Sequence, residues 1–381
     1  MSDERTYLDW NATAPLLPEA RAAMERALEV YGNPSSVHIE GRRARAIVET
    51  ARDQVAALAR ARASEVVFTS GATEACNMAL AGPWGAILRA GIEHDAVLKP
   101  AAASGSEIVE LRVGRDGVID VADLSDKVRS AIARHGAGRV VLALQLANNE
   151  TGVIQPLADV AAVAREAGAV IFSDAVQAVG RIPVDFAAVG IDAMAVSAHK
   201  FGGPKGVGAL ILRDGVELPA LIHGGGQERR RRGGTENIPG IAGFGAAAEV
   251  ARKTIADSGR IARLRDRLEA GVIALTPRAE IIGATAERLP NTTCVAVPGL
   301  SAETLVIRFD LAGFAISAGA ACSAGKIGAS GVLMAMGLSD ATARSAVRIS
   351  LGSTTTDAEI DRFLEARRDI ASAPLLRTAA A

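Results

Sequence analysis

The chain contains 381 residues, which is long enough to bury a large core and to form more than one domain. Its 42 Lys and Arg residues nearly balance its 43 Asp and Glu residues, which argues against general electrostatic binding of nucleic acid or acidic membranes. The sequence shows neither an apolar signal core nor an apolar run of roughly 20 residues, so we expect a cytoplasmic protein without a membrane span. The three scattered cysteines fit neither a disulfide framework nor a metal site.

The first two-thirds of the chain alternates between helical and strand patterns. A helix is expected to begin at Pro18, to carry Met24, Leu28 and Tyr31 on one face, and to stop at Gly32. The other expected elements follow in chain order: a helix after Gly41, strands at 66–69 and 140–144, a helix at 157–167, and strands at 170–172 and 193–200. This order predicts an α/β fold with a mostly parallel sheet flanked by helices.

The pattern changes after about residue 250. The expected elements there are a charged helix at 252–275, strands at 281–282, 294–297, 314–316 and 346–350, and a helix from Ser301. Thr356 and Glu359 form a capping box for a last helix. We therefore expect a large domain at 16–250 and a smaller α+β domain made of 1–15 and 251–381.

Lys200 stands at the end of the strand expected at 193–200, directly before a Gly- and Pro-rich loop. Most lysines in such places are solvated loop charges. A buried lysine amine, however, forms Schiff bases, because burial or a nearby cation lowers its pKa. Asp174 ends the preceding strand of the chain. A lysine amine and a carboxylate for a pyridine nitrogen are what a protein contributes to the chemistry of pyridoxal phosphate (PLP).

Polar residues also follow other expected strands. Because ligands bind beyond the carboxyl ends of strands in open parallel sheets, we expect these residues to meet in one site. The backbone N–H groups of Ala72 and Thr73, at a helix start, suit a phosphate, as do Ser197 and His199. Taken alone, His199 would more simply be a structural histidine. The residues suited to contact a cofactor's ring oxygen are Asn149 and Gln177.

Seven segments carry a more specific pattern: YLDWNAT (7–13), GNPSS (32–36), NNETG (148–152), SDAVQ (173–177), SAHK (197–200), GGGQER (224–229) and GGTEN (233–237). In this order they resemble segments of the cysteine desulfurases of the NifS/IscS type. The resemblance covers nearly the whole chain. It implies the PLP fold-type-I architecture of the class V aminotransferases, a homodimer, and conversion of L-cysteine to L-alanine. It also implies that a persulfide forms on an enzyme cysteine and passes to a protein sulfur acceptor, such as an iron–sulfur scaffold.

The resemblance adds roles that the residues do not suggest alone. It implies that His94 stacks on the PLP ring and that Thr235 reaches the phosphate of the other subunit's cofactor. It further implies that Arg348 binds the substrate carboxylate, with Asn149 also at the substrate. A planar guanidinium suits a carboxylate because it donates two parallel hydrogen bonds. Without the resemblance, the simpler interpretation of His94 is a structural histidine. That of Arg348 is an arginine of a strand surface that forms an ordinary ion pair.

Cys322 lies among small residues in the segment 317–326. Taken alone, an inert cysteine is the simpler interpretation. The resemblance instead implies that the thiolate of Cys322 attacks the sulfur of the bound cysteine. Many relatives carry Pro and His where this chain has Ala329 and Gly331, a difference that concerns acceptor docking rather than the PLP site.

Other functions remain open from the sequence. One is a selenocysteine lyase or another PLP-dependent class V transferase, and another is a weakly catalytic scaffold of a sulfur-transfer assembly. Cys322 favours sulfur transfer, because transamination needs no thiol acceptor. The basic run 229–232 would suit nucleic acid, but in a chain of balanced charge it is more simply a solvated or interfacial segment.

Overall fold

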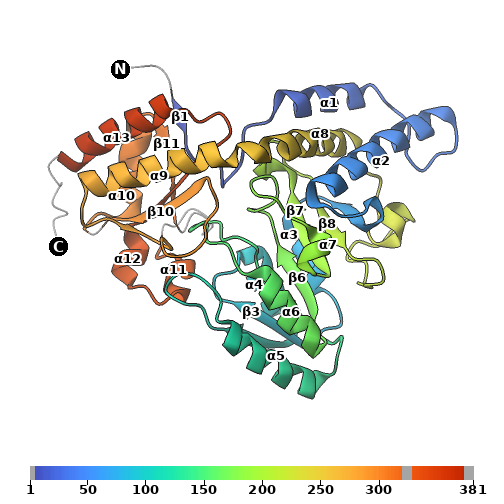
Figure 1. The fold of residues 1–381 in the computed structure, drawn as a ribbon. Helices are drawn as coiled ribbons and strands as arrows, with labels where there is room; N and C mark the ends of the chain where they lie inside the picture. Colours follow the sequence, from blue (N-terminus) through green and yellow to red (C-terminus); the bar gives the residue numbers. More distant parts are fainter. Residues whose placement is uncertain (1–4, 298, 320–327, 373–381) are drawn as a thin grey trace, which may run out of the picture.

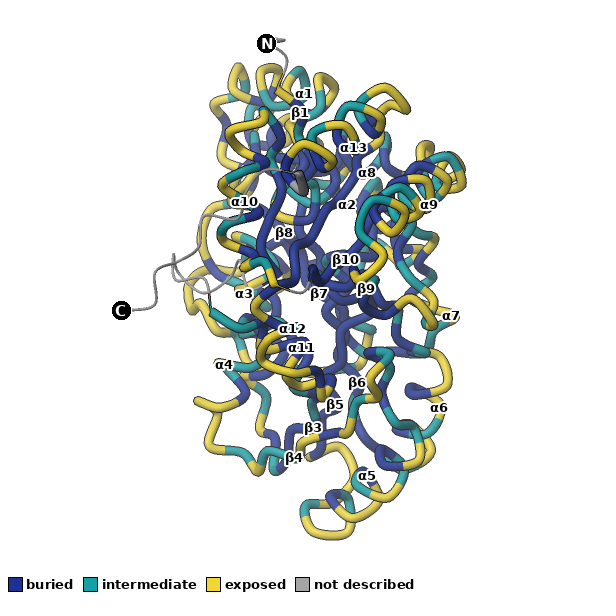
Figure 2. The backbone as a smooth tube through the Cα atoms, turned by 90° about the vertical axis from the view of Figure 1, so that its left-hand side faces the viewer, coloured by how far each residue is buried: buried dark blue, intermediate teal, exposed yellow. Residues whose placement is uncertain are grey.

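The computed structural model describes residues 5–297, 299–319 and 328–372. Figure 1 shows a larger part, coloured from blue to yellow, and a smaller part formed by the orange and red end of the chain together with the first strand. The helices α8 (Ile238–Thr254) and α9 (Ser258–Leu275) follow one another from the larger part to the smaller part. Figure 2 shows buried backbone at the centre of both parts and exposed helix surfaces outside.

The larger part is built around a seven-stranded sheet with the strand order β2-β8-β7-β6-β5-β3-β4. The strands are β2 (Val66–Thr69), β3 (Ala86–Ala90), β4 (Glu107–Leu111), β5 (Val140–Ala143), β6 (Val170–Asp174), β7 (Ala193–Ser197) and β8 (Gly208–Leu212). Neighbouring strands are parallel except where they pair with β8. The expected mostly parallel sheet is therefore confirmed.

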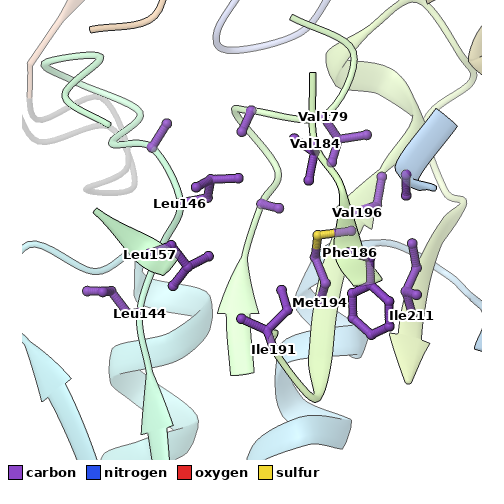
Figure 3. Close-up of a cluster of buried hydrophobic side chains, with 14 of the residues drawn as sticks. Leu144, Leu146, Leu157, Val179, Val184, Phe186, Ile191, Met194, Val196 and Ile211 are labelled. Atoms are coloured by element: carbon purple, nitrogen blue, oxygen red, sulfur yellow. The ribbon is translucent and has the colours of Figure 1, made fainter. Parts of the chain in front are cut away.

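Helices cover both faces of this sheet, because alternate residues of each buried strand point to opposite sides. Val67 and Phe172 pack on one side with α3 (Ala72–Leu80) and α4 (Asp95–Ala103). The helices on the other side are α1 (Pro18–Leu28), α2 (Ile39–Ala59), α5 (Val121–His135), α6 (Leu157–Ala167), α7 (Phe186–Val189) and α8. Figure 3 shows part of this second cluster, in which Met194 and Val196 of β7 lie beside Phe186.

The smaller part contains a four-stranded antiparallel sheet with the order β12-β13-β10-β9, and a parallel pair of β1 and β11. The strands are β1 (Thr6–Tyr7), β9 (Glu280–Ile281), β10 (Thr292–Ala296), β11 (Phe314–Ala315), β12 (Ser317–Ala318) and β13 (Ala346–Ser350). The helices are α9, α10 (Ala302–Leu311), α11 (Gly331–Ala335), α12 (Asp340–Ser345) and α13 (Asp357–Ser372). Phe309 and Phe363 stack in its core with ring centroids 4.5 Å apart.

The apolar face predicted for the first helix is partly wrong. α1 ends at Leu28, and its fully buried residues are Ala20 and Ala27, whereas Leu28 and Tyr31 are exposed. The reason is that α1 lies against α8, whose buried residues are mostly Gly and Ala. Small residues on both helices allow a close approach, which larger side chains would prevent.

Two helix boundaries also differ from the prediction. The second helix, α2, begins at Ile39 after the cap His38, so Gly41 lies inside it. The charged helix expected at 252–275 is two helices, because α8 ends at Thr254 and α9 begins at Ser258. The domain boundaries 16–250, 1–15 and 251–381 stay a prediction. Val332 and Leu333 of α11 belong to the apolar cluster of the larger part.

Candidate active site

A cavity of about 630 Å³ lies at the carboxyl ends of the parallel strands. Its walls come from the segments that follow β5, β6 and β7, from the starts of α3 and α4, from residues 11–13 and from β13. Ten of the expected site residues line it: Ala72, Thr73, His94, Asn149, Asp174, Gln177, Ser197, His199, Lys200 and Arg348. Cavities of this size hold ligands as large as a cofactor.

Lys200 reaches the cavity from η2 (Ala198–Lys200), a short turn directly after β7. Its Nζ lies 2.7 Å from the carbonyl oxygen of Asn11 and 3.1 Å from that of Ala12. Gly208 of β8 permits the close packing beneath this turn, since a Cβ there would lie 2.6 Å from the carbonyl oxygen of Val196. The amine is therefore held against the N-terminal segment of the chain.

Asp174 and Gln177 come from the end of β6 and the turn after it. The Asp174 carboxylate is buried and accepts a hydrogen bond of 3.0 Å from the N–H of Val176. Burial raises the pKa of Asp174, and the nearby His94 and Lys200 oppose this effect. A protonated pyridine nitrogen beside Asp174 would stabilise the ionised carboxylate.

His94 caps the N-terminus of α4, where its Nδ1 accepts a hydrogen bond of 3.0 Å from the N–H of Ala96. In a neutral imidazole the nitrogen that accepts carries no proton, so this bond favours the tautomer protonated on Nε2. The neighbouring Glu93 is buried and accepts a hydrogen bond from the N–H of Gln145. Burial raises the pKa of Glu93 well above its usual range.

The first turn of α3 supplies the backbone of Ala72 and Thr73 to the cavity. Glu74 holds this turn in place: it accepts hydrogen bonds from the N–H of Ser70 at 2.8 Å and from Arg232 Nε at 3.0 Å. The N-terminus of a helix carries partial positive charge and exposed N–H groups. This end of the cavity therefore suits a phosphate.

His199 lies near the same end, with Nδ1 at 3.2 Å from Thr13 Oγ1. Burial lowers the pKa of His199 to about 4, and nearby cations, Lys200 first among them, act in the same direction. The imidazole is thus neutral at physiological pH. Ser197, also in the cavity wall, ends β7 and is buried.

Arg348 enters from β13, and its side chain is 3% exposed. Its Nη2 donates to Asp9 Oδ1 at 2.7 Å and its Nη1 to the carbonyl oxygen of Asn149 at 3.0 Å. The Nε is buried and has no hydrogen-bond partner among the described residues. The planar guanidinium in the cavity wall is suited to a carboxylate.

Asn11 connects the segments that form the cavity. Its carbonyl oxygen accepts from Lys200 Nζ and from Gln177 Nε2 at 3.1 Å. Its Nδ2 donates to the carbonyl oxygen of Asn149 at 3.1 Å, and its N–H donates to Ser350 Oγ at 2.9 Å. The sequence identified Asn11 only as part of a motif, since these partners lie 138 to 339 positions away.

Two expected features lie elsewhere, and a third is not described by the structure. Thr235 is exposed on the loop before α8 and does not line this cavity. Cys322 lies outside the described residues. Within the basic run, Arg229 and Arg231 donate to the carbonyl oxygen of Ser64, and Arg232 pairs with Glu74. The run is thus largely used in contacts within the chain, which favours the interpretation that it is not a nucleic-acid surface.

Comparison with known proteins places the chain in a family. The family model described as aminotransferase class-V matches residues 6–363. The chain belongs to the aminotransferase class-V family. A cysteine desulfurase of Cereibacter sphaeroides is 44% identical over 374 residues, covering 95% of this chain and 94% of the relative. An IscS-like cysteine desulfurase of Mycobacterium tuberculosis is 40% identical and covers 94% of both chains.

Solved structures of this family agree in fold. A NifS-like protein of Rickettsia africae has a TM-score of 0.90 at 32% identity and covers 97% of this chain and 100% of its own. SspA, solved in complex with cysteine, has a TM-score of 0.78 at 31% identity and covers 92% of this chain and 100% of its own. These similarities confirm the expected fold-type-I architecture.

The part of the chain that the structure describes contains neither a candidate membrane span nor a candidate metal site. None of its helices combines the length and apolar character needed to span a membrane. Likewise, its His, Cys, Asp and Glu side chains form no group of three or more that could hold a metal ion.

Proposed function

We propose that the protein is a cysteine desulfurase that converts L-cysteine to L-alanine and passes the sulfur, as a persulfide, to a protein acceptor. The observation that carries this proposal is the single cavity that gathers Lys200, Asp174 and Arg348 at the carboxyl ends of the sheet. An amine, a buried carboxylate and a buried guanidinium are the groups that an amino-acid substrate and PLP require. The two relatives described above carry the same function in their names.

The residues present fit PLP as the cofactor. Lys200 would supply the amine for its aldehyde, Asp174 the carboxylate for its ring nitrogen, and the first turn of α3 the N–H groups for its phosphate, with Ser197 and His199 beside this turn. His94 would lie against the ring. When bound, PLP supplies an aldehyde that condenses with amines and a ring that accepts the electron pair of a broken bond to Cα.

Arg348 binds the carboxylate of L-cysteine, and Asn149 lies next to it, since Arg348 Nη1 already donates to the Asn149 carbonyl. This contact fixes the orientation of the substrate. Lys200 Nζ then takes the proton from the substrate Cα and returns a proton when alanine forms. The neutral His199 would donate to the phosphate as an uncharged group.

Cys322 acts as the nucleophile in this proposal. Its thiolate attacks the sulfur of the substrate, so that a new S–S bond forms while the substrate's Cβ–S bond breaks. The electron pair of that bond stays on the carbon side, which is protonated to give L-alanine. Cys322 retains the sulfur as a persulfide, so a thiol and L-cysteine become a persulfide and L-alanine without any outside oxidant.

We further propose a homodimer in which Thr235 of one chain serves the phosphate of its partner, consistent with its exposed position outside its own cavity. The names of the relatives favour cysteine over selenocysteine as the substrate. An iron–sulfur scaffold or a similar protein is the acceptor to test first, and the cytoplasm is the expected location.

The deciding experiment measures alanine and sulfide from purified protein, PLP, L-cysteine and a reductant. Wild-type protein is expected to be coloured and to release both products in equal amounts. Cys322→Ser should keep the visible absorbance of PLP but lose sustained sulfide release, because no thiol can accept the sulfur. Lys200→Ala should lack the covalently held cofactor. A colourless wild-type protein, or a Cys322→Ser variant with full turnover, would contradict the proposal.

A further inference from the structure

Four residues form a closed ring of hydrogen bonds behind the cavity. Arg181 donates to the side-chain oxygen of Gln177, and Gln177 Nε2 donates to the carbonyl oxygen of Asn11 at 3.1 Å. The same carbonyl accepts from Lys200 Nζ at 2.7 Å, and the carbonyl oxygen of Lys200 accepts from Arg181 Nη2 at 3.3 Å. The ring therefore links the amine and the main-chain carbonyl of Lys200, the lysine that we assign to PLP, to Gln177 of the cavity wall.

Arg181 is the member of the ring that uses the most donors. Its Nη1 also donates to the carbonyl oxygen of Gln177 at 3.0 Å and its Nη2 to that of Trp10 at 3.1 Å. No carboxylate ion-pairs with Arg181 in the described part of the chain. Its contacts are thus backbone and amide oxygens, which a planar, forked guanidinium can bond simultaneously and a lysine cannot.

The turn that carries Arg181 is fixed by packing. Val179 lies in the apolar cluster of Figure 3, beside Val184. Gly180 has a φ of 86°, and a Cβ there would lie 2.8 Å from the Cβ of Phe201, the residue after Lys200. The guanidinium therefore has little freedom to leave the ring. Arg181 lines a separate cavity of about 200 Å³ on the other side of Lys200 and does not line the larger one.

The bond from Arg181 and the bond to the Asn11 carbonyl together fix which way the amide of Gln177 points. A guanidinium only donates, so it requires the amide oxygen and turns the NH₂ group toward Asn11 and the cavity. Gln177 can then donate, rather than accept, at an oxygen of the cofactor. Without Arg181, only the bond from Gln177 Nε2 to the Asn11 carbonyl would hold the amide, so the flipped orientation, which presents an acceptor to that oxygen, would become less costly.

We propose, building on the proposed function, that Arg181 is a positioning residue that keeps Gln177 a donor toward the PLP ring and holds the main chain of Lys200 in place. The positive charge of Arg181 also lies close enough to His199 to lower the pKa of that imidazole. Its electrostatic effect therefore extends to the segment that carries Lys200. The other charged or titratable groups around this segment are Asp174, His94, Lys205, Arg348 and Asp9.

The test is a pH titration of the visible absorbance of the PLP-loaded protein, whose midpoint reports protonation at the Lys200 nitrogen. In Arg181→Gln we expect the midpoint to rise by roughly one pH unit. The variant loses a nearby cation and the fixed donor at the ring oxygen, and both of these disfavour protonation of the Lys200 nitrogen. Arg181→Lys, which keeps the charge but not the fork, should give a smaller rise. The kcat should fall roughly tenfold in Arg181→Gln, with little change in the KM for cysteine.

Arg213→Gln is the matched control. Arg213 is another partly buried arginine that donates to a main-chain oxygen, that of Ile191, and it lies outside both cavities. Its replacement should leave the midpoint unchanged. A loaded Arg181→Gln protein with the wild-type midpoint overturns the inference alone, whereas a wild-type protein that takes up no PLP overturns the proposed function with it. If Arg181→Gln does not fold, Arg181→Lys decides by the same criterion.

Discussion

Glu150 is a buried carboxyl group beside the proposed substrate site. Its Oε2 accepts a hydrogen bond of 2.5 Å from Ser330 Oγ, and a Cβ on Gly319 would lie 3.2 Å from it. Burial raises the pKa of Glu150 to about 7, although Ser330, Arg348 and His94 favour the charged form. The group therefore changes its charge within the physiological pH range.

This titration makes the stability of the fold depend on pH. Between about pH 4.5 and 7 the folded protein holds a proton on Glu150 that the unfolded chain releases. The contribution of Glu150 to the free energy of unfolding is therefore most favourable below this window and is lost as pH rises through it. Glu150→Gln should gain stability relative to wild type over the same window, by up to about 3 kcal/mol. Urea unfolding at several pH values measures this. The exposed Glu25→Gln should show no such trend, and parallel curves for Glu150→Gln and wild type would contradict the assignment.

The polar residues at strand ends were predictable from the sequence, because parallel strands bring their carboxyl ends to one edge whatever the details of packing. Their partners were not. Asp9, Asn11 and Arg181 act through carbonyl oxygens and side chains contributed by distant segments. Arg181 follows Gln177 by four positions, but only the fold shows that this turn packs against Lys200. The local sequence alone would predict that such an arginine is a solvated surface charge.

At the scale of elements, a buried ion pair fixes an unusual loop. Arg52 of α2 donates to both carboxylate oxygens of Glu228, at 2.7 and 2.8 Å, and Glu228 also accepts from the N–H of Phe68. Glu228, Arg229 and Arg230 all have φ between 44° and 65°, a left-handed conformation that costs of order 1 kcal/mol per residue without glycine. The ion pair therefore holds a strained segment in place next to the start of α3.

Breaking this pair should be costly. Arg52→Met leaves the Glu228 carboxylate buried without its partner, and we expect a loss of about 3–5 kcal/mol in the free energy of unfolding. Arg45→Met, an exposed change on the same helix, should cost less than about 0.5 kcal/mol. Replacing both partners, as in Arg52→Met with Glu228→Leu, should restore part of the loss. Equal stabilities of Arg52→Met and Arg45→Met in urea would refute the role of the pair.

Elements with one clear apolar face were predicted well. The helix expected at 157–167 is α6, which ends at Ala167 before Gly168 in a left-handed conformation, and the capping box at Thr356 begins α13. α8 was missed because it is apolar around most of its circumference and rich in glycine. Periodicity and helix propensity both fail for such a sequence, and only burial between α1 and α2 makes it a stable helix.

At the scale of the whole molecule, large apolar side chains are exposed near the connection of α1 to α2. Leu28 is 68% exposed, Tyr31 and Val37 are each 87% exposed, and Ile39 is 49% exposed. Apolar residues gathered on one surface indicate an interface with another protein. This surface, made of residues 28–39, is where we expect the partner chain of the proposed homodimer to bind.

Sedimentation at several concentrations tests this expectation. Wild-type protein should behave as a dimer, and Tyr31→Asp combined with Val37→Asp should weaken association at least roughly tenfold, because two charges would be buried without partners. Leu311→Asp changes a residue of α10 that is 78% exposed in the smaller part, and it should leave the dimer intact. A wild-type monomer, or a double variant as dimeric as wild type, would rule out this interface.

The fold class followed from the order of strands and helices, but the pairing of distant segments did not. β1 contains only two residues and pairs in parallel with β11, more than 300 positions later in the chain. Such a short strand has no pattern of its own. Its position depends on the core around Leu8, whose neighbours include Phe314 and Ile349.

This long-range pairing sets the order in which the protein can form on the ribosome. Asn11 and Asp9 emerge 339 residues before their partners Ser350 and Arg348. The larger sheet, which ends at Leu212, can fold as it leaves the exit tunnel. A nascent chain therefore carries Lys200 and Asp174 of the cavity wall well before β13 is made and adds Arg348 to the same wall.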